Sequence, residues 1–211
     1  MKEEMNVLKH YTNVDALFKI LSDGFLFSDG QKWEDKNDSF DIQQYAIYLN
    51  KHVLVLCFCD GDGNIYHWNS LGWKDKKNKN SNIKCSIVLN KEEMLQYIRT
   101  LGSDYEHHNV IYCHNADVSM KNVSEVPYLK RMEFAVEKEY RIVYKGTHSN
   151  VLLPCIQRYV TKIVIGRCES SDFDMIRNKL NSDYGIPLDI IRQNKLLDSQ
   201  EWRNNIQKLF V

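Results

Sequence analysis

The sequence is poor in the two residues that most often interrupt regular structure. Its 211 residues include only 9 glycines and 3 prolines, well below the usual ~7% and ~5%. This scarcity argues against a turn-rich β-sandwich and favours a mixed α/β chain. Net charge is also absent, because 28 basic residues balance 28 acidic ones. The chain therefore lacks the global charge of a protein that binds nucleic acid or an anionic membrane, although a local basic patch is compatible with this balance.

Long apolar runs are missing as well. No stretch approaches the ~18 apolar residues of a membrane-spanning helix, and the opening MKEEMNVLKHY lacks the apolar core of a signal peptide. The six cysteines form no C-x-x-C pair, and most lie in apolar runs, as buried thiols do. We therefore expect a cytoplasmic protein with six free thiols and no membrane contact.

Short motifs with well-known chemistry are absent too. The sequence contains no Walker A loop, no dinucleotide-binding glycine fingerprint and no G-x-S-x-G nucleophile elbow. The densest set of metal-binding residue types is His107, His108, Cys113 and His114. Adjacent histidines in a strand point to opposite faces, and no second ligand pair follows at zinc-like spacing. We therefore predict no metal site.

Hydrophobic periodicity predicts helices and strands in mixed order. Asn13 can cap a helix whose apolar residues recur with helical spacing, and Gly24 can end it. The continuous apolar run 53–59 is typical of a central strand covered on both faces. Further helices are expected over 39–50, 91–101 and 172–180, and further strands over 25–28, 83–89, 110–114, 134–144, 151–156, 161–165 and 188–191. The polar segment 74–82 should form an exposed loop.

This order of elements predicts the fold class. Strands and helices do not alternate strictly, which favours an α+β fold over a doubly wound one. We expect a single domain over residues 1–211, built on a mixed, bent or split β-sheet with flanking helices.

Two segments suggest a site. In the first, His10, Tyr11 and Thr12 precede the first helix, whose backbone amides could favour an anion. The alternative is that Thr12 or Asn13 merely caps the helix and Tyr11 packs. From spacing alone, this second interpretation is favoured.

The second segment is the expected strand over 134–144. Alternation would place Glu137, Glu139 and Arg141 on one face. Two carboxylates and a guanidinium are costly to bury unless they pair or bind something. The segment is either an edge strand with a solvated ion-pair ladder or one wall of a cleft in which Arg141 holds a phosphate or carboxylate.

These motifs resemble the bacterial domain of unknown function 2971. The resemblance covers nearly the whole chain in order and spacing, with Ser39, Asp41 and Cys59 departing from the family pattern. The segments that carry it are His10-Tyr11-Thr12, Asn37-Asp38-Ser39-Phe40-Asp41, Cys57-Phe58-Cys59, Trp68, Glu137-Lys138-Glu139-Tyr140-Arg141 and residues 160–166.

The same motifs are more distantly similar to ADP-ribosyltransferases of the His-Tyr-Glu type. That resemblance implies an ADP-ribosyltransferase-like fold that uses NAD as a substrate. His10 would contact a ribose hydroxyl and Tyr11 would stack on the nicotinamide. Glu139, with Glu137 as its companion, would stabilise the cationic transition state. Cys59 replaces the serine of the usual pattern.

The leading hypothesis is therefore an NAD-dependent ADP-ribosyltransferase-like enzyme that acts in bacterial conflict or phage defence. Its expected catalytic residues are Glu139, Glu137 and Tyr11. Residues expected to bind the nucleotide are His10, Tyr11, Thr12, Arg141 and Trp68. The alternatives are a non-catalytic domain that binds a small nucleotide or other ligand, and a nuclease. The sequence does not identify a macromolecular target.

Overall fold

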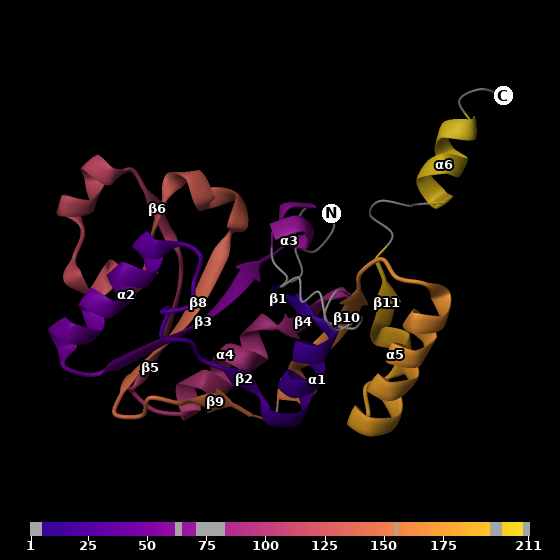
Figure 1. Cartoon of the computed structure of the whole chain (residues 1–211), viewed down its shortest axis with the longest axis horizontal. Helices are drawn as coiled ribbons and strands as arrows, with labels where there is room; N and C mark the ends of the chain where they lie inside the picture. Colours follow the sequence, from indigo (N-terminus) through magenta and orange to yellow (C-terminus); the bar gives the residue numbers. More distant parts are fainter. Residues whose placement is uncertain (1–5, 62–64, 71–82, 155, 195–199, 209–211) are drawn as a thin grey trace.

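A computed structural model describes residues 6–61, 65–70, 83–154, 156–194 and 200–208. Within these residues the chain forms a seven-stranded sheet with the order β11-β10-β4-β1-β3-β8-β5. Neighbouring strands run antiparallel except the parallel pair β10 and β11. Figure 1 shows helices flanking this sheet. The architecture confirms the predicted α+β class with a mixed sheet.

The strands and helices have the following bounds. The strands are β1 Val7–Asn13, β2 Phe25–Leu26, β3 His52–Asp60, β4 Lys84–Asn90, β5 Tyr105–Asn109, β6 Ile111–Cys113, β7 Leu129–Arg131, β8 Glu139–Gly146, β9 Leu152–Leu153, β10 Val160–Ile165 and β11 Ile191–Gln193. The α-helices are α1 Val14–Asp23, α2 Lys36–Leu49, α3 Ile65–Ser70, α4 Lys91–Thr100, α5 Ser170–Tyr184 and α6 Gln200–Gln207. The 3₁₀ helices are η2 Asn115–Met120, η3 Val123–Tyr128, η4 Met132–Glu137, η5 Ile156–Tyr159 and η6 Leu188–Ile190.

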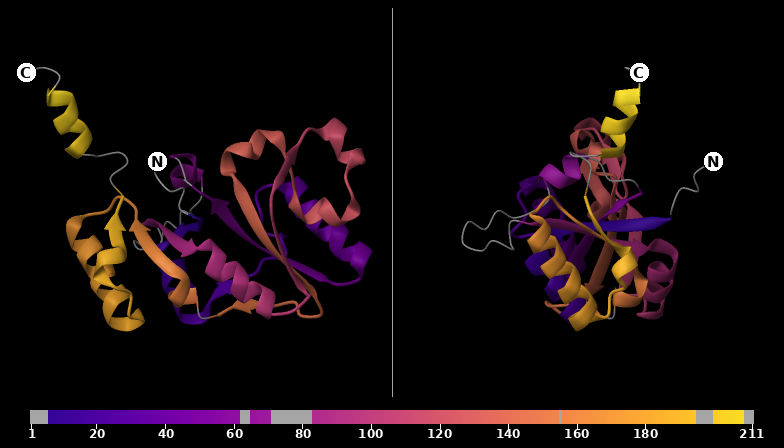
Figure 2. Two further views of the ribbon diagram at one scale, coloured as in Figure 1. Left: turned by 180° about the vertical axis from the view of Figure 1, so that it is seen from behind. Right: turned by 90° about the vertical axis from the view of Figure 1, so that its right-hand side faces the viewer.

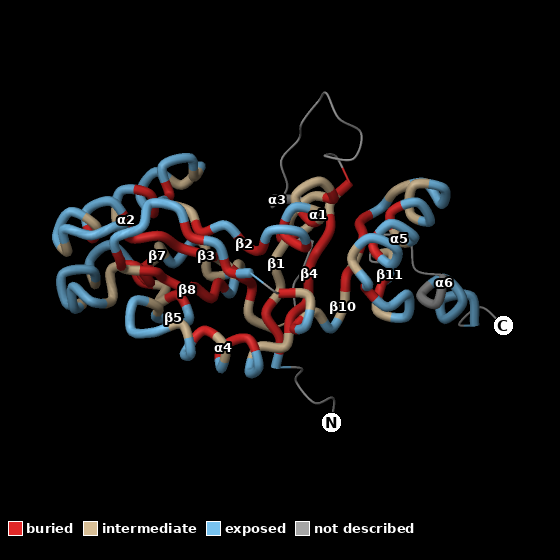
Figure 3. Tube along the Cα trace, turned by 90° about the horizontal axis from the view of Figure 1, so that it is seen from below, coloured by how far each residue is buried: buried red, intermediate tan, exposed pale blue. Residues whose placement is uncertain are grey.

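The larger hydrophobic core lies on one face of the sheet, which we call the core face. Alternate residues of the central strands, such as Leu8, Leu56 and Ile87, pack there against α1, α4 and α5. Figure 1 shows these three helices on one side of β1 and β4, and α3 on the other. Figure 3 shows the buried strands between helices whose outer surfaces are exposed.

A smaller core lies on the opposite face, which we call the second face. There α2 packs on β3 and β8 through Ile42 and Tyr45, which contact Val55 and Val143. Asp35 begins α2, because its carboxylate accepts hydrogen bonds from the amides of Asn37 and Asp38. This cap places Asp38 in the first turn of the helix, facing the start of β8.

The sheet is split between β1 and β3. These strands pair only at Leu8 with Asp60 and at Lys9 with Cys59, whereas β1 pairs with β4 along its whole length. The segment after α1 lies in the resulting wedge. Ser28 forms an isolated bridge with Val55, and Phe25 packs on the ring of Phe58. The sheet is therefore split, as predicted, and the split lies between β1 and β3.

Several predicted boundaries were wrong. The expected strand over 134–144 begins only at Glu139, because residues 132–137 form η4 and Lys138 adopts a left-handed conformation with φ 46°. Most of the expected strand at 188–191 is the 3₁₀ helix η6, and β11 follows it. The strand β5 was not predicted. The expected loop over 74–82 lies outside the described residues.

The helix α6 was not predicted either. It projects away from the rest of the chain in both views of Figure 2. No helix among the described residues is both long and apolar enough to cross a membrane.

We expect Gly24→Ala to destabilise the protein by clearly more than Gly185→Ala. Both glycines have positive φ, which costs ~1–2 kcal/mol for an L-residue with a side chain. A Cβ on Gly24 would also lie 2.3 Å from the Leu153 carbonyl oxygen, whereas nothing lies within 4 Å of a Cβ on Gly185. Urea unfolding of both variants measures the difference, and equal losses would contradict the packing of α1 against β9.

Candidate functional site

Arg141 lies at the centre of a buried charge cluster on the second face. Its side chain is 0% exposed. Nε donates to Glu139 Oε1 at 2.8 Å, Nη1 to the Pro127 carbonyl oxygen at 2.8 Å, and Nη2 to Asp38 Oδ2 at 2.5 Å. Every guanidinium nitrogen therefore has a protein partner. The expected edge strand with a solvated ladder is not what the structure shows, because β8 lies between β3 and β5 and Arg141 is buried.

Lys130 joins the same cluster from β7. Its ammonium donates to Glu137 Oε2 at 2.6 Å and to Glu139 Oε2 at 2.9 Å, and lies 3.6 Å from Asp38 Oδ2. Three carboxylates thus face two cations, which leaves one negative charge in excess. Asp38 Oδ1 is buried and has no hydrogen-bond partner.

The cluster keeps Glu139 ionised. Burial alone would raise the pKa of this carboxyl, but the adjacent Arg141 and Lys130 charges overcome that effect and lower the pKa to about 2. Lys130 shows the complementary behaviour, because burial opposes its charge while the carboxylates of Glu139 and Asp38 raise its pKa. Glu139 is therefore a fixed negative charge across the physiological range rather than a proton acceptor.

Glu137 reaches the cluster from η4 rather than from the strand. The left-handed Lys138 separates it from β8, and the Lys138 carbonyl accepts a hydrogen bond from the Asp60 amide at 2.8 Å. Glu137 is the more accessible carboxylate, with 15% of its side chain exposed against 8% for Glu139. Its Oε1 also accepts a hydrogen bond from the Tyr66 hydroxyl at 3.0 Å.

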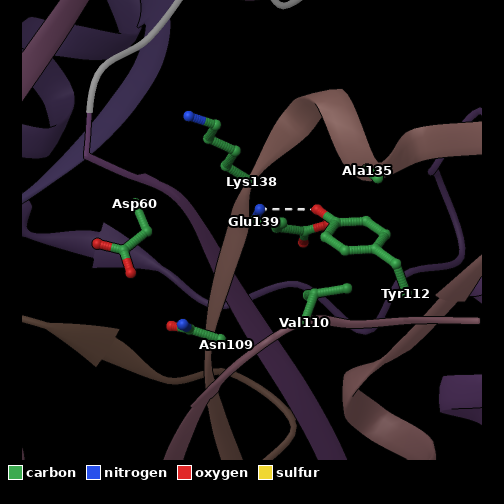
Figure 4. Close-up of a pocket in the computed structure, with 7 residues that line it drawn as sticks. All are labelled: Asp60, Asn109, Val110, Tyr112, Ala135, Lys138 and Glu139. Atoms are coloured by element: carbon green, nitrogen blue, oxygen red, sulfur yellow. Dashed lines mark hydrogen bonds between the residues drawn. The ribbon is translucent and has the colours of Figure 1, made fainter. Parts of the chain in front are cut away.

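A pocket of about 280 Å³ lies beside the start of β8 (Figure 4). In Figure 4 the Tyr112 ring lies in front of Glu139, and the Tyr112 hydroxyl accepts a hydrogen bond from the Glu139 amide at 2.8 Å. The other lining residues are Asp60, Asn109, Val110, Ala135 and Lys138. This volume is close to the lower limit of small-molecule sites, so the pocket suits one ring or sugar rather than a whole dinucleotide.

Tyr11 lies on the same face of the sheet as Glu139. Cross-strand pairs link Lys9 to Cys59 and Cys59 to Glu139, and directly paired residues share a face. Tyr11 follows two residues after Lys9 and stacks on His67, with ring centroids 5.0 Å apart. The Glu137 carbonyl lies 2.9 Å from His67 Nε2. His67 therefore links Tyr11 to the backbone of Glu137.

Trp68 belongs to this aromatic group. Its indole meets the Tyr11 ring edge-on at 5.4 Å, and its backbone carbonyl accepts a hydrogen bond from Lys84 Nζ at 2.6 Å. Because α3 carries both His67 and Trp68, this one short helix positions the aromatic group beside Glu137.

His10 and Thr12 are oriented toward the core face instead. His10 packs edge-on against Phe25 and Phe58, and its Nδ1 lies 3.1 Å from the Cys57 carbonyl oxygen. Burial lowers the pKa of His10. Thr12 pairs with Cys85, a residue of the larger core. The structure thus brings together Tyr11, Trp68, Glu137, Glu139 and Arg141, but not His10 or Thr12.

Sequence reasoning missed several members of the site. Asp38 was noted within a family motif but not as the partner of Arg141, and Lys130 carried no local signal. Tyr66 and His67 directly precede Trp68, which the sequence did indicate. Their position next to Trp68 in the sequence was the signal that could have identified them. Tyr112 was not found, because it lies 27 residues from the Glu139 amide that it binds.

Comparisons with known proteins do not assign the chain to a family. No family model matches the chain, and a search of curated proteins found no match. Among the described residues no group of three or more His, Cys, Asp or Glu side chains could hold a metal ion.

We expect Arg141→Lys to lower the free energy of unfolding by ~1.5–3 kcal/mol or more, because it loses hydrogen bonds to charged groups while keeping the positive charge. A single ammonium cannot make the three sets of contacts that the guanidinium makes. Lys179→Gln is the control, because its pair with Asp183 is exposed and should contribute less than ~1 kcal/mol. Chemical denaturation measures both, and a loss under ~1 kcal/mol for Arg141→Lys would contradict the observed network.

A second expectation concerns Asp41, which lies on α2 beside the cluster. Burial and the neighbouring Asp38 charge raise its pKa to about 6. The folded protein therefore holds this proton more tightly than the unfolded chain, so its contribution to stability is present below pH ~4 and is lost as the pH rises through 6. The free energy of unfolding of Asp41→Asn should rise relative to that of wild type between pH ~4 and pH ~6. Above pH ~6 the difference between the two proteins should be constant. A pH-independent difference would show that Asp41 is not perturbed.

Proposed function

We propose that this chain is an ADP-ribosyltransferase-like enzyme that cleaves the glycosidic bond of NAD at the start of β8. One observation carries the proposal. The carboxylates of Glu137 and Glu139 belong to a cluster with one excess negative charge, and Glu139 lines the adjoining pocket. The resemblance to His-Tyr-Glu enzymes supports the same assignment for Tyr11 and Glu139, whereas His10 lies on the core face and takes no part in it.

The chemistry needs a fixed negative charge more than it needs a base. As the bond between nicotinamide and the ribose carbon breaks, its electron pair leaves with nicotinamide and positive charge develops on the ribose. Water or an acceptor hydroxyl then bonds to that carbon and releases a proton. A carboxylate held beside the developing cation stabilises the transition state. Glu139, with its pKa near 2, would supply that charge at every physiological pH.

The aromatic side chains support the proposed binding of nicotinamide. Nicotinamide is a flat ring that an aromatic side chain can hold by stacking. Tyr11 and Trp68 are partly exposed and lie on the side of the sheet that carries the carboxylates. Arg141 would act as a positioning residue, since all its donors hold Glu139, Asp38 and a backbone carbonyl.

A second candidate is a domain that binds a nucleotide without cleaving it. The observation in its favour is that both oxygens of Glu139 are already engaged, Oε1 by Arg141 and Oε2 by Lys130. A ribose hydroxyl would have to compete with these cations. In this case the pocket would bind its ligand through Asn109 and Tyr112 with no chemical step.

Nicotinamide release from millimolar NAD distinguishes the two candidates. We expect Glu137→Gln and Glu139→Gln each to lower the rate by ~10²–10³, the usual cost of one well-placed electrostatic group. Glu137→Gln leaves the contacts of Arg141 in place, so its loss of activity would not reflect misfolding. Glu133→Gln is the matched control, because this exposed residue of η4 carries the same charge nearby.

Calorimetry with NAD completes the test. Binding without turnover in the wild type would favour the second candidate. An absence of binding at millimolar NAD would overturn the first candidate and limit the second to a ligand other than NAD.

A further inference from the structure

A group of polar side chains lies on the core face, where β5 pairs with β8 at the edge of the sheet. His107 pairs with the core residue Ile142, so its ring is on that face. The ring stacks on that of Tyr140, and its Nδ1 lies 2.7 Å from the Tyr140 hydroxyl. The ammonium of Lys91, at the start of α4, lies 4.4 Å from the centre of the same Tyr140 ring.

The contact between His107 and Tyr140 determines which nitrogen of the histidine carries the proton. Burial and the charge of Asp60 raise the pKa of Tyr140 to about 12, so its hydroxyl keeps its proton. Burial and the charge of Arg99 lower the pKa of His107, so the ring is neutral at pH 7. Among the described residues, His107 Nδ1 is the acceptor available to that hydroxyl. The hydroxyl therefore donates to Nδ1, which leaves the ring proton on Nε2.

Two donors beside Tyr140 have no partner among the described residues. One is Nε2 of His107, and the other is the guanidinium of Arg99, an exposed residue of α4. The helix α4 packs against β5, and the charge of Arg99 acts on both His107 and Tyr140. Lys91 differs from them, because its ammonium pairs with Asp60 at 2.7 Å. We call Arg99, His107, Lys91 and Tyr140 the His107 group.

The His107 group is continuous with the pocket at the start of β8. Asp60 contacts Lys91 and also lines the pocket. Asn109 lines it too, and it follows His107 by two residues on the same face of β5, at a distance of about 7 Å along the strand. Figure 4 shows Asp60 and Asn109 on the opposite side of β8 from Tyr112. A ligand whose ring occupied the pocket would therefore hold its substituent beside the His107 group.

We propose that the His107 group binds the phosphate of a phosphorylated sugar whose ring occupies the pocket. Arg99 offers a fork of parallel N–H donors, which matches phosphate oxygens, and His107 Nε2 adds a third donor. Lys91 contributes charge while it stays paired with Asp60. The side chain of Asn109 has no described partner and is available to the sugar hydroxyls.

This phosphate belongs either to a separate sugar phosphate or to a dinucleotide such as NAD. The site does not depend on the proposed cleavage of NAD, because Arg99 and His107 lie outside the carboxylate cluster. A titration with ribose 5-phosphate involves no NAD, so it tests the site separately from the reaction. Competition between the two compounds then distinguishes the sources, since NAD displaces ribose 5-phosphate only if its own phosphate uses the site.

The test is calorimetric titration of the full chain with ribose 5-phosphate at low ionic strength. We expect Arg99→Gln to weaken binding by ~10–100-fold, the effect of losing hydrogen bonds to a charged group. The control is Arg158→Gln, which removes the same charge from an exposed arginine that lies over the rings of Tyr97 and Tyr159, and it should match wild type.

A second pair of variants tests the role of the tyrosine hydroxyl. Tyr140→Phe removes the group that keeps the histidine proton on Nε2, so we expect it to weaken binding by ~2–10-fold. Tyr144→Phe is the matched control, because Tyr144 lies on the same face of β8 but its hydroxyl contacts the His148 amide instead. It should bind ribose 5-phosphate as wild type does.

Three outcomes would overturn the proposal. They are binding of ribose 5-phosphate by wild type no tighter than that of ribose, equal affinities of Arg99→Gln and Arg158→Gln, and equal or tighter binding of ribonate. The last outcome would indicate a carboxylate rather than a phosphate as the ligand group. Circular dichroism and thermal unfolding of each variant show whether it folds, so a loss of binding in a folded Arg99→Gln variant supports the site.

Discussion

The arrangement of the second face depends on one buried guanidinium. A fully buried Arg141 is tolerated only because Glu139, Asp38 and the Pro127 carbonyl surround it. These partners come from β8, α2 and η3, so one charge fixes three segments against each other. The hydrophobic contacts of Val143 with α2 support the same placement. The cluster therefore specifies how this half of the fold is assembled, and it holds Glu139 in one orientation.

Alternation along β1 determines which of its residues can share a site. His10 points to the core face, toward Phe25 and Phe58, while the next residue, Tyr11, lies on the face of Glu139. A motif of adjacent residues is thereby divided between two environments. A ligand on the second face can therefore contact Tyr11 but not His10, and Tyr11 is linked to the backbone of Glu137 through His67.

Local signals made part of this structure predictable. The helix α1 was predictable because all its signals are local and indicate the same helix. These signals are the cap at Asn13, the helical spacing of Val14 and Leu17, and Gly24 at the end. The shift of Glu137 off the strand could not be foreseen, because it depends on the left-handed Lys138. The partner of Arg141 was also hidden, since Asp38 lies 103 residues away. The strand β5 lacks apolar alternation because its sequence is YEHHN, and it is defined by its pairing with β8.

The 103-residue separation between Asp38 and Arg141 also has a consequence for the order of folding. Lys130, Glu137, Glu139 and Arg141 lie within a short stretch, so their contacts close small loops at little entropic cost. The contact with Asp38 closes a far longer loop, and α2 can dock only once β3 and β8 have paired. We therefore expect α2 to join the fold late and to exchange its amide hydrogens faster than β3 in the native state.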